Sequence, residues 1–391
     1  MNKIQLCDIY SCTQCRACEQ VCPKHCISFV EGKDGFEFPH IDTDLCIECG
    51  ACVKSCHQLS LTKEKNQPLY AYAAWSNDEQ VRTTSSSGGV FSEIARYVFE
   101  KNGVVAGAVM DEDLKVRHTF ATDMESLFPM RGSKYVQSDL RGVYSKIKEY
   151  LRAEHFVLFT GTPCQVAGLY TFLKKDYPNL LTCDLVCHGV PSQKSFDTYC
   201  EKTGLKDKVV EVAFRYTKGW GLQMASRKHL ESTIKPNASK WNCISPRKSY
   251  YLRAFTGGLM FDESCYNCHY ATPQRVSDLT MADYWGIGTM VPFSHPKKKG
   301  ISLLLVNSEK GKAVVGECQD LFIVERPFGE AAQGNHNLSQ CSDRPQERET
   351  YCQDAETMPI DALIKKYRIE PSFKDYLRPL KRRIIKGKFL L

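Results

Sequence analysis

Eight cysteines near the N-terminus occur in two copies of one spacing. The first copy reads CTQCRACEQVCP from Cys12 to Pro23, and the second reads CIECGACVKSCH from Cys46 to His57. Thiolates gathered this densely are soft ligands that suit zinc or an iron–sulfur cluster. Zinc sites usually pair two CxxC corners separated by a loop, whereas here three cysteines at every third residue precede a fourth. The spacing therefore favours iron–sulfur chemistry.

Each copy has the pattern C-x2-C-x2-C-x3-C, which is the spacing of bacterial two-cluster ferredoxins. Three closely spaced thiolates bind three irons of one 4Fe-4S cluster. The fourth cysteine cannot fold back onto that cluster, so it binds the other one. We therefore expect residues 1–62 to form a ferredoxin-like module with two 4Fe-4S clusters. The predicted ligands are Cys12, Cys15, Cys18 and Cys56 for one cluster and Cys46, Cys49, Cys52 and Cys22 for the other.

Three residues near these copies fall outside the shared pattern. His57 stands in the second copy where the first copy has Pro23, and we expect this exchange to loosen the turn after Cys56 without affecting the ligand. Cys7 and Cys26 do not fit the spacing, and we interpret them as small buried hydrophobic residues.

The composition is that of an ordinary globular chain. Its 391 residues are 42% hydrophobic and 25% charged, which allows two or three packed units. No apolar run approaches the roughly 20 residues needed to span a bilayer, and no apolar export segment precedes the first cysteines, so we expect the cytoplasm. In such a reducing compartment, clustered cysteines more often hold metal than form disulfides.

The charge is unevenly distributed along the chain. Residues 1–62, which we call the head, carry five Lys/Arg and eight Asp/Glu, a balance of −3 within a net charge of +7. The remaining residues, which we call the body, therefore carry +10. An acidic head on a basic body suggests contact within one molecule and not nucleic-acid binding.

A polar connector at residues 57–68 precedes alternating strand and helix patterns. We predict strands at 70–75, 104–110, 155–161 and 180–189, and helices at 90–102, 144–151 and 162–175. This alternation indicates an α/β body with a mostly parallel or mixed sheet.

Two turns of the body contain residues that could bind a ligand. Ser85–Gly89 opens a helix, where free N–H groups and glycine suit a phosphate, although a plain serine cap explains the turn equally well. Cys164 follows a strand at the edge where open α/β sheets place their ligands. Further on, Cys183 and Cys187 precede a CxxC formed by Cys265 and Cys268, whose spacing alone is equally compatible with a redox dithiol, zinc and an iron–sulfur corner.

Ordered motifs across roughly residues 70–290 resemble the beta-subunit family of coenzyme F-420-reducing hydrogenase and formate dehydrogenase, which also includes an iron–sulfur chlorophyllide reductase. A two-cluster ferredoxin module is often fused to that family. The motifs are SSSGGVFSEIARY, RGSKYVQSDL, FTGTPCQVAGL, DLVCHGVPS, FRYTKGWG, SCYNCHYA and RVSDLTMADYWGIG.

The resemblance implies a body that binds FAD and a third 4Fe-4S cluster. Its site residues map onto Ser86, Ser87, Gly88, Gly89 and Lys134 for the flavin, and onto Cys164, Cys187, Cys265 and Cys268 for the cluster, with Cys183 able to replace Cys187. Most lysines are solvated surface charges, and this simpler interpretation also applies to Lys134 and Arg131. Asp283, Trp285 and Gly286 match the last of these motifs, RVSDLTMADYWGIG. We interpret them as residues that pack near the site or line it. Phe261-Asp262-Glu263 depart from the basic stretch that the resemblance leads us to expect, which leaves the nature of an anionic substrate open.

We therefore expect an iron–sulfur flavoprotein oxidoreductase that exchanges electrons with a ferredoxin or another redox subunit and hydride with a small molecule. The alternatives are a ferredoxin-dependent reductase of an organic substrate and an electron-transfer adaptor without a substrate.

We divide the chain into residues 1–62, a flavin-binding body at 63–345 with parts at 70–150 and 151–330, and a C-terminal tail at 346–391. Six basic residues between Arg378 and Lys388 make this tail a solvated segment, a docking arm or a membrane-surface contact.

Overall fold

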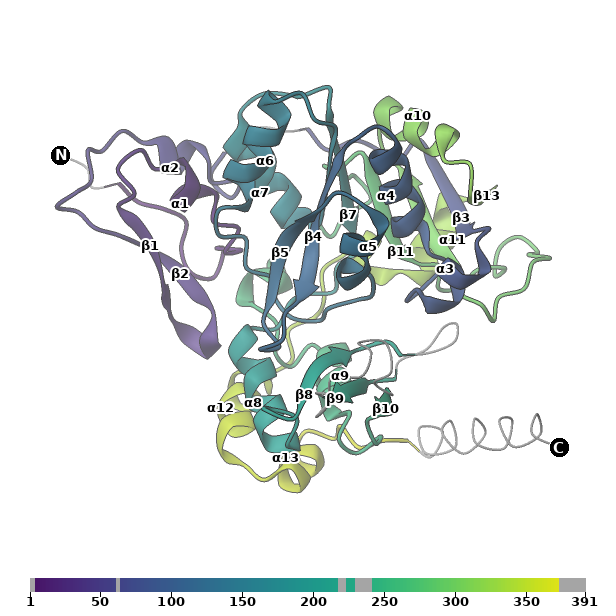
Figure 1. Cartoon of the computed structure of the whole chain (residues 1–391). Coiled ribbons are helices and arrows are strands. Elements are labelled where there is room, and N and C mark those ends of the chain that lie inside the picture. Colours follow the sequence, from purple (N-terminus) through teal and green to yellow (C-terminus); the bar gives the residue numbers. More distant parts are fainter. Residues whose placement is uncertain (1–3, 61–63, 217–222, 229–240, 373–391) are drawn as a thin grey trace, which may run out of the picture.

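The computed structural model describes residues 4–60, 64–216, 223–228 and 241–372. The head lies to one side of the body, at the left of Figure 1. It consists of the antiparallel pair β1 (Ile27–Glu31) and β2 (Glu37–Ile41) and two short helices, α1 (Ala17–Val21) and α2 (Ala51–Lys54). Each helix follows a residue with positive φ, Arg16 at 59° and Gly50 at 69°, so the two cysteine copies fold alike.

Within the described ranges, eight strands of the body form one mixed sheet in the order β13-β3-β12-β11-β7-β6-β4-β5. The central strands β4, β6, β7 and β11 are parallel, and the other pairings are antiparallel. The predicted mixed sheet is thus confirmed. The strands are β3 (Tyr70–Ser76), β4 (Val104–Met110), β5 (Val116–Ala121), β6 (Val157–Gly161), β7 (Leu180–Leu185), β11 (Leu279–Asp283), β12 (Ser302–Val306) and β13 (Leu321–Glu325).

Helices cover both faces of this sheet, and their apolar side chains pack against it. On one face lie α4 (Val90–Glu100), α5 (Met124–Leu127) and α10 (Glu309–Glu317). On the other lie α6 (Val143–Arg152), α7 (Pro163–Leu173) and α11 (Phe328–Gly334). The head packs on the side of α6 and α7, where Ala17 joins their core (Figure 1). A further helix, α3 (Glu79–Thr84), follows β3.

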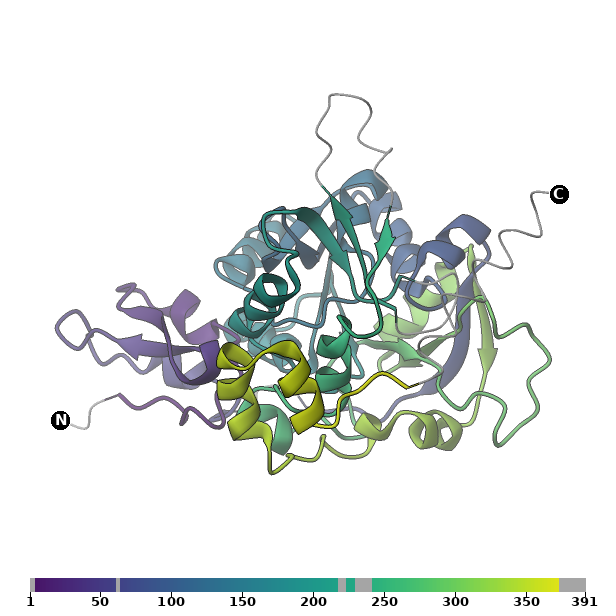
Figure 2. The ribbon, with the colours of Figure 1, turned by 90° about the horizontal axis from the view of Figure 1, so that it is seen from below.

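A smaller lobe lies below the sheet in Figure 1 and has its own aromatic core, which includes Phe196, Tyr199, Phe214 and Tyr251. Figure 2 shows that its C-terminal helices lie beside the head. The lobe contains β8 (Val209–Ala213), β9 (Ala225–Lys228), β10 (Asn242–Cys243), α8 (Gln193–Thr203), α9 (Tyr250–Thr256), α12 (Arg348–Thr357) and α13 (Ile360–Lys366).

The expected tail at 346–391 needs correction at its start. Residues of α12 and α13, such as Tyr351 and Leu363, are buried in the core of the smaller lobe, so the folded body continues past residue 345. The basic stretch between Arg378 and Lys388 lies outside the described residues. In the parts that are described, every helix is too short or too polar to traverse a bilayer.

Ion pairs of both polarities join head and body. The expected attraction of an acidic head to a basic body is present in three pairs and reversed in two. The pairs are Asp34 with Arg348, Glu31 with Lys194, Glu37 with Arg141, Lys33 with Glu349 and Arg16 with Asp139.

Candidate functional site

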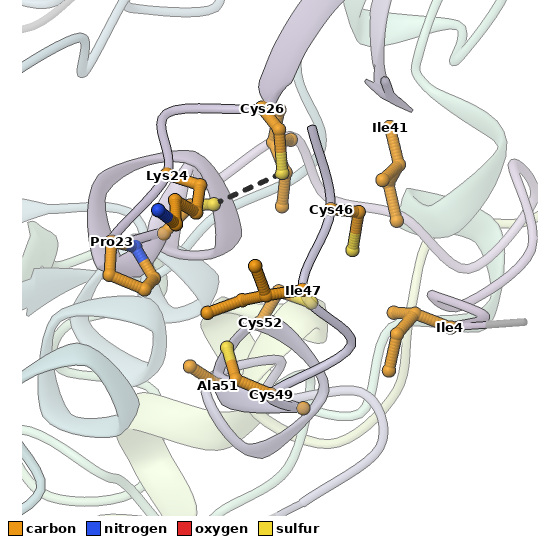
Figure 3. Close-up of a pocket in the computed structure, with 13 residues that line it drawn as sticks. Ile4, Pro23, Lys24, Cys26, Ile41, Cys46, Ile47, Cys49, Ala51 and Cys52 are labelled. Atoms are coloured by element: carbon orange, nitrogen blue, oxygen red, sulfur yellow. Dashed lines mark hydrogen bonds between the residues drawn. The ribbon is translucent and has the colours of Figure 1, made fainter. Parts of the chain in front are cut away.

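A small open cavity in the head is lined by Cys46, Cys49 and Cys52 of the second copy together with Cys22 of the first. Figure 3 shows Cys46, Cys49 and Cys52 around it. Cys22 reaches this cavity from the other copy, as the crossed-ligand hypothesis requires. Four free thiols around an open cavity fit a 4Fe-4S cluster, and we call these four residues the outer site.

The remaining four cysteines of the two copies form what we call the inner site, on the side of the head that faces the body. They are Cys12, Cys15, Cys18 and Cys56. Burial, and to a smaller extent the nearby charge of Cys56, raises the pKa of Cys15 to about 11. Burial, with Cys15 and Cys56 close by, also raises the pKa of Cys18. Cys56 is therefore a neighbour of the first triplet, and buried thiols with raised pKa become ligands when a metal displaces their protons.

Two cysteines that the spacing left unassigned lie beside the crossed ligands. The Sγ of Cys26 is 3.4 Å from that of Cys22, and Cys26 also lines the cavity of the outer site. The Sγ of Cys7 is 3.7 Å from that of Cys56 at the inner site. Cys26 is buried, as expected, and Cys7 is half-buried. Their proximity to the ligands was not predictable from the spacing.

No three His, Cys, Asp or Glu side chains of the described residues converge closely enough to hold a single metal ion. A 4Fe-4S cluster places its four thiolates at separate corners, so these ligands lie further apart than those of one ion.

A third group of cysteines lies at the carboxyl edge of the body sheet. Cys164 occupies the first turn of α7, directly after β6, and Cys187 follows the end of β7. Cys265 and Cys268 belong to the 3-10 turn η4 (Glu263–Asn267) and its C-cap. Burial, with Cys268 nearby, raises the pKa of Cys187 to about 12, and burial followed by the charges of Cys268 and Cys187 raises that of Cys164. The four residues form what we call the body cysteine group.

Cys183 does not belong to this group. It lies within β7 and is buried among the apolar residues under α4 and α10. Burial and neighbouring carboxylates raise its pKa, and no other cysteine contributes. Of the two alternatives left open by the sequence, the structure brings Cys187 to the group. Cys341 contributes to the raised pKa of Cys268, so it lies nearby, and its Sγ is 3.0 Å from the carbonyl of Tyr266.

The Ser86–Gly89 turn and Lys134 lie side by side near the carboxyl ends of β3 and β11. Ser86 Oγ accepts a hydrogen bond of 3.1 Å from the backbone N–H of Ser133. Ser87 Oγ donates to the carbonyl of Ile301 at 2.9 Å. Lys134 is half-buried and donates to two carbonyls of its own loop, Pro129 and Arg131, and burial lowers its pKa to about 7.

Gly88 is required by packing, so the argument that it leaves room for a phosphate does not apply at this position. A Cβ there would lie 2.3 Å from the carbonyl oxygen of Ala74 and 2.9 Å from the nitrogen of Ser302. Gly89 has a φ of 92° and starts α4, so a left-handed conformation explains this second glycine. The serine hydroxyls of the turn and the free N–H groups at the start of α4 are still compatible with a flavin phosphate.

Unpartnered polar atoms near this turn could receive a ligand. Among the described residues, buried Arg131 Nε and Asp283 Oδ1 have no hydrogen-bond partner. Asp283 pairs with Arg215 and lies at the carboxyl end of β11, opposite Ser302 of β12. Ser302 Oγ accepts a hydrogen bond from Gly88 N–H, so Asp283 lies near the turn. A cation and a carboxylate with free atoms at this edge fit the phosphate and a polar part of a flavin. Trp285, beside Arg215, is partly exposed and fits the predicted lining role.

The duplicated cysteine motif and the mixed α/β body with buried thiols define an iron–sulfur protein of a redox class. Residues 11–59 match the model of a 4Fe-4S dicluster domain. Residues 71–144 and 155–326 match the N-terminal and C-terminal models of the coenzyme F420 hydrogenase/dehydrogenase beta subunit, which together cover more than half of the chain. The chain belongs to this family, and the resemblance seen in its motifs is confirmed.

A chain of the F420-reducing [NiFe] hydrogenase complex from Methanosarcina barkeri, solved in a xenon-derivatised form, is similar in structure at 16% identity and a TM-score of 0.46. The match covers 77% of this chain and 93% of that one. No curated protein matches.

Proposed function

We propose that this chain is an iron–sulfur flavoprotein oxidoreductase that passes electrons between a ferredoxin-type partner and a small molecule that exchanges hydride. Two 4Fe-4S clusters occupy the inner and outer sites, and a third is held by the body cysteine group. FAD binds at the carboxyl edge of the sheet, near Ser86–Gly89 and Lys134. The family supports the oxidoreductase class, and the positions of the thiols support the cluster sites.

One observation carries this proposal, the contact between the inner site and the helix that begins with a ligand of the body group. A Cβ built on Gly168 of α7 would lie 2.9 Å from Cys15 Sγ, and Cys164 stands one turn earlier on α7. This proximity supports electron transfer between a cluster at the inner site and a cluster in the body cysteine group.

The flavin supplies the exchange between one-electron and two-electron transfer when it is bound. The residues of the chain bind and orient it. Arg131 and Lys134 offer positive charge to its phosphates, Ser86 offers a hydroxyl, and Asp283 offers a carboxylate oxygen for a donor group. The substrate approaches from the same edge, where Trp285 is partly exposed.

The partner is a ferredoxin or another redox subunit that reaches the outer site, where Cys49 is exposed. We place the chain in a reducing compartment such as the cytoplasm, because many of its cysteines cluster at iron–sulfur spacings and such clusters more often hold metal than form disulfides there. Coenzyme F420 is the hydride carrier that the family name suggests. The alternative is an organic substrate that is reduced with electrons from ferredoxin. A substrate screen would distinguish this alternative from coenzyme F420.

Anaerobic purification with iron, acid-labile sulfide and flavin measured per chain tests the proposal. Three full clusters require about 12 irons and two require about 8. The expected result is about 12 irons, matching sulfide and one FAD. A body with one zinc and no labile sulfide would overturn the third cluster, and a colourless, flavin-free body would overturn the flavoprotein.

A pH titration tests the place of Lys134 in the flavin site. Because burial lowers the pKa of Lys134 to about 7, its ammonium form is present below that pH and is lost above it. FAD affinity should therefore fall as the pH rises through about 7. Lys134→Met should bind FAD weakly at every pH and lose this dependence. An unchanged affinity in this variant would return Lys134 to an ordinary loop residue.

A further inference from the structure

The histidine that replaces proline in the second cysteine copy joins the head to the body. His57 is 2% exposed, and its two ring nitrogens have partners on opposite sides. Nε2 lies 2.8 Å from Thr13 Oγ1 in the first copy, and Nδ1 lies 2.7 Å from the Tyr270 hydroxyl of the body. Proline at this position could make neither hydrogen bond. The departure from the repeated pattern therefore has a structural use, namely a link from both copies to the body.

The second departure from the family pattern lies at the same junction. Asp262 Oδ2 accepts a hydrogen bond of 3.0 Å from Nε2 of Gln14 in the head. Glu263 is 3.3 Å from the fully buried Arg348, which also pairs with Asp34 of the head. The acidic residues before Cys265 thus hold the head in place, which explains them without reference to a substrate.

Helix α7 presents one face to the head. Cys164, Gly168 and Thr171 are four and three residues apart, so they lie along the same side of the helix. Gly168 leaves room for Cys15, and Thr171 Oγ1 donates a hydrogen bond of 2.8 Å to the carbonyl of Ser55. The face that carries a ligand of the body group is therefore the face on which both cysteine copies rest.

From these contacts we propose that electrons cross between head and body at the inner site, along the α7 face, and that His57 and Tyr270 are positioning residues that fix this crossing. The inference rests on the proposed function, because it requires a cluster in the body cysteine group. One electron leaves one site and arrives at the other, with no bond made or broken, and the redox partner supplies or accepts it at the outer site.

The test uses the full-length protein with its clusters. Tyr270→Phe removes only the hydroxyl, His57→Pro restores the residue of the first copy, and His57→Gln keeps a hydrogen-bonding side chain. The matched controls are Tyr10→Phe and His40→Gln, which change exposed residues of the head. Two readouts are recorded, amide hydrogen exchange in residues 163–173 and the magnetic coupling between reduced clusters in electron paramagnetic resonance.

We expect the wild type and both controls to show coupling between the inner and body clusters. Tyr270→Phe should speed exchange in α7 by about fivefold and weaken the coupling, whereas His57→Pro should abolish the coupling at unchanged iron content. His57→Gln should restore most of it. A purely structural role would change exchange without moving the coupling, and that result would overturn the inference.

The two proposals fail in different ways. A wild type with only about 8 irons would refute the body cluster and, with it, the electron crossing. A wild type with about 12 irons whose coupling is unaffected in Tyr270→Phe and His57→Pro would leave the proposed function intact and overturn this inference alone.

Discussion

The inner and outer sites of the head are built from the same four-cysteine spacing but have different surroundings. The outer site lies at a small open cavity, and its Cys49 is exposed to solvent. The inner site is covered by α7, and its Cys15 lies directly against Gly168. Pro23 follows the first copy at the exposed outer cavity, whereas His57 follows the second copy at the buried junction.

This difference shows how two copies of one motif come to lie in different environments. The local spacing specifies two equivalent metal sites, and the body makes them unequal by covering one of them. In the proposed function, the exposed site exchanges electrons with a partner and the covered site exchanges them with the body. A few contacts hold this asymmetry in place, so it can be broken residue by residue.

The largest effect should come from removing a crossed ligand together with the spare thiol beside it. Because Cys26 Sγ lies 3.4 Å from Cys22 and Cys7 Sγ lies 3.7 Å from Cys56, each spare thiol can replace its neighbour. Cys22→Ala and Cys56→Ala alone should keep most of the iron. Each corresponding double alanine variant should lose about 4 irons, counted by colorimetric assay.

The identity of the lost cluster tests the crossing itself. The Cys22/Cys26 double variant should lose the outer cluster and keep the coupling of the inner cluster to the body. The Cys7/Cys56 double variant should lose that coupling. The reverse pattern would contradict the crossed-ligand assignment.

The next largest effect should come from Arg348, the buried cation between head and lobe. Arg348→Ala leaves Asp34 and Glu263 without their shared partner, and breaking such a buried pair costs about 3–5 kcal/mol. The measurement is the denaturation midpoint of the protein with clusters bound. Arg344→Ala is the control, because Arg344 is 37% exposed and should contribute about 1 kcal/mol or less through its pair with Glu263. Equal effects of the two variants would refute the docking role of Arg348.

The sequence predicted those parts of the site whose geometry is local. The spacing within each cysteine copy indicated the two clusters, and the strands and helices around Cys164 followed from hydrophobic periodicity. The strand predicted at 180–189 ends at Leu185 in the structure, and this end places Cys187 in a loop while Cys183 stays in the sheet. Periodicity could not locate that end, so the choice between the two cysteines remained open.

The junction could not be predicted, because it depends on contacts between distant segments. His57 and Tyr270 are 213 residues apart, and each looks ordinary in its own segment. At Gly88 the sequence suggested a role that the structure explains in another way. Its local pattern suggested a phosphate site, but the tertiary packing of β3 and β12 explains the glycine.

A single methyl group at the junction should have a moderate effect. In Gly168→Ala the new Cβ would meet Cys15 Cβ at 2.8 Å and the Tyr144 hydroxyl at 2.9 Å, and overpacking of this kind costs about 1–3 kcal/mol. Gly316→Ala is the matched control, since a Cβ on Gly316 of α10 would meet nothing within 4 Å. That control should be stabilised by about 0.5–1 kcal/mol. Thermal denaturation of both variants measures the contrast, and a stabilised Gly168→Ala would show that the head does not rest on α7.

The smallest effect should come from the rim of the interface, where Lys194 pairs with Glu31 of the head at 3.0 Å and with Glu356 at 3.3 Å. Lys194 and Glu31 are 45% and 61% exposed, so water and salt screen their attraction and each such pair contributes about 0–1 kcal/mol. Lys194→Met keeps the aliphatic stem that packs on Gly35 and removes only the charge. The denaturation midpoint should shift slightly at low salt and not at all at high salt, and the coupling between the inner and body clusters should persist. A loss as large as that of Arg348→Ala would mean that rim charges, and not the buried junction around α7 and His57, hold the head against the body.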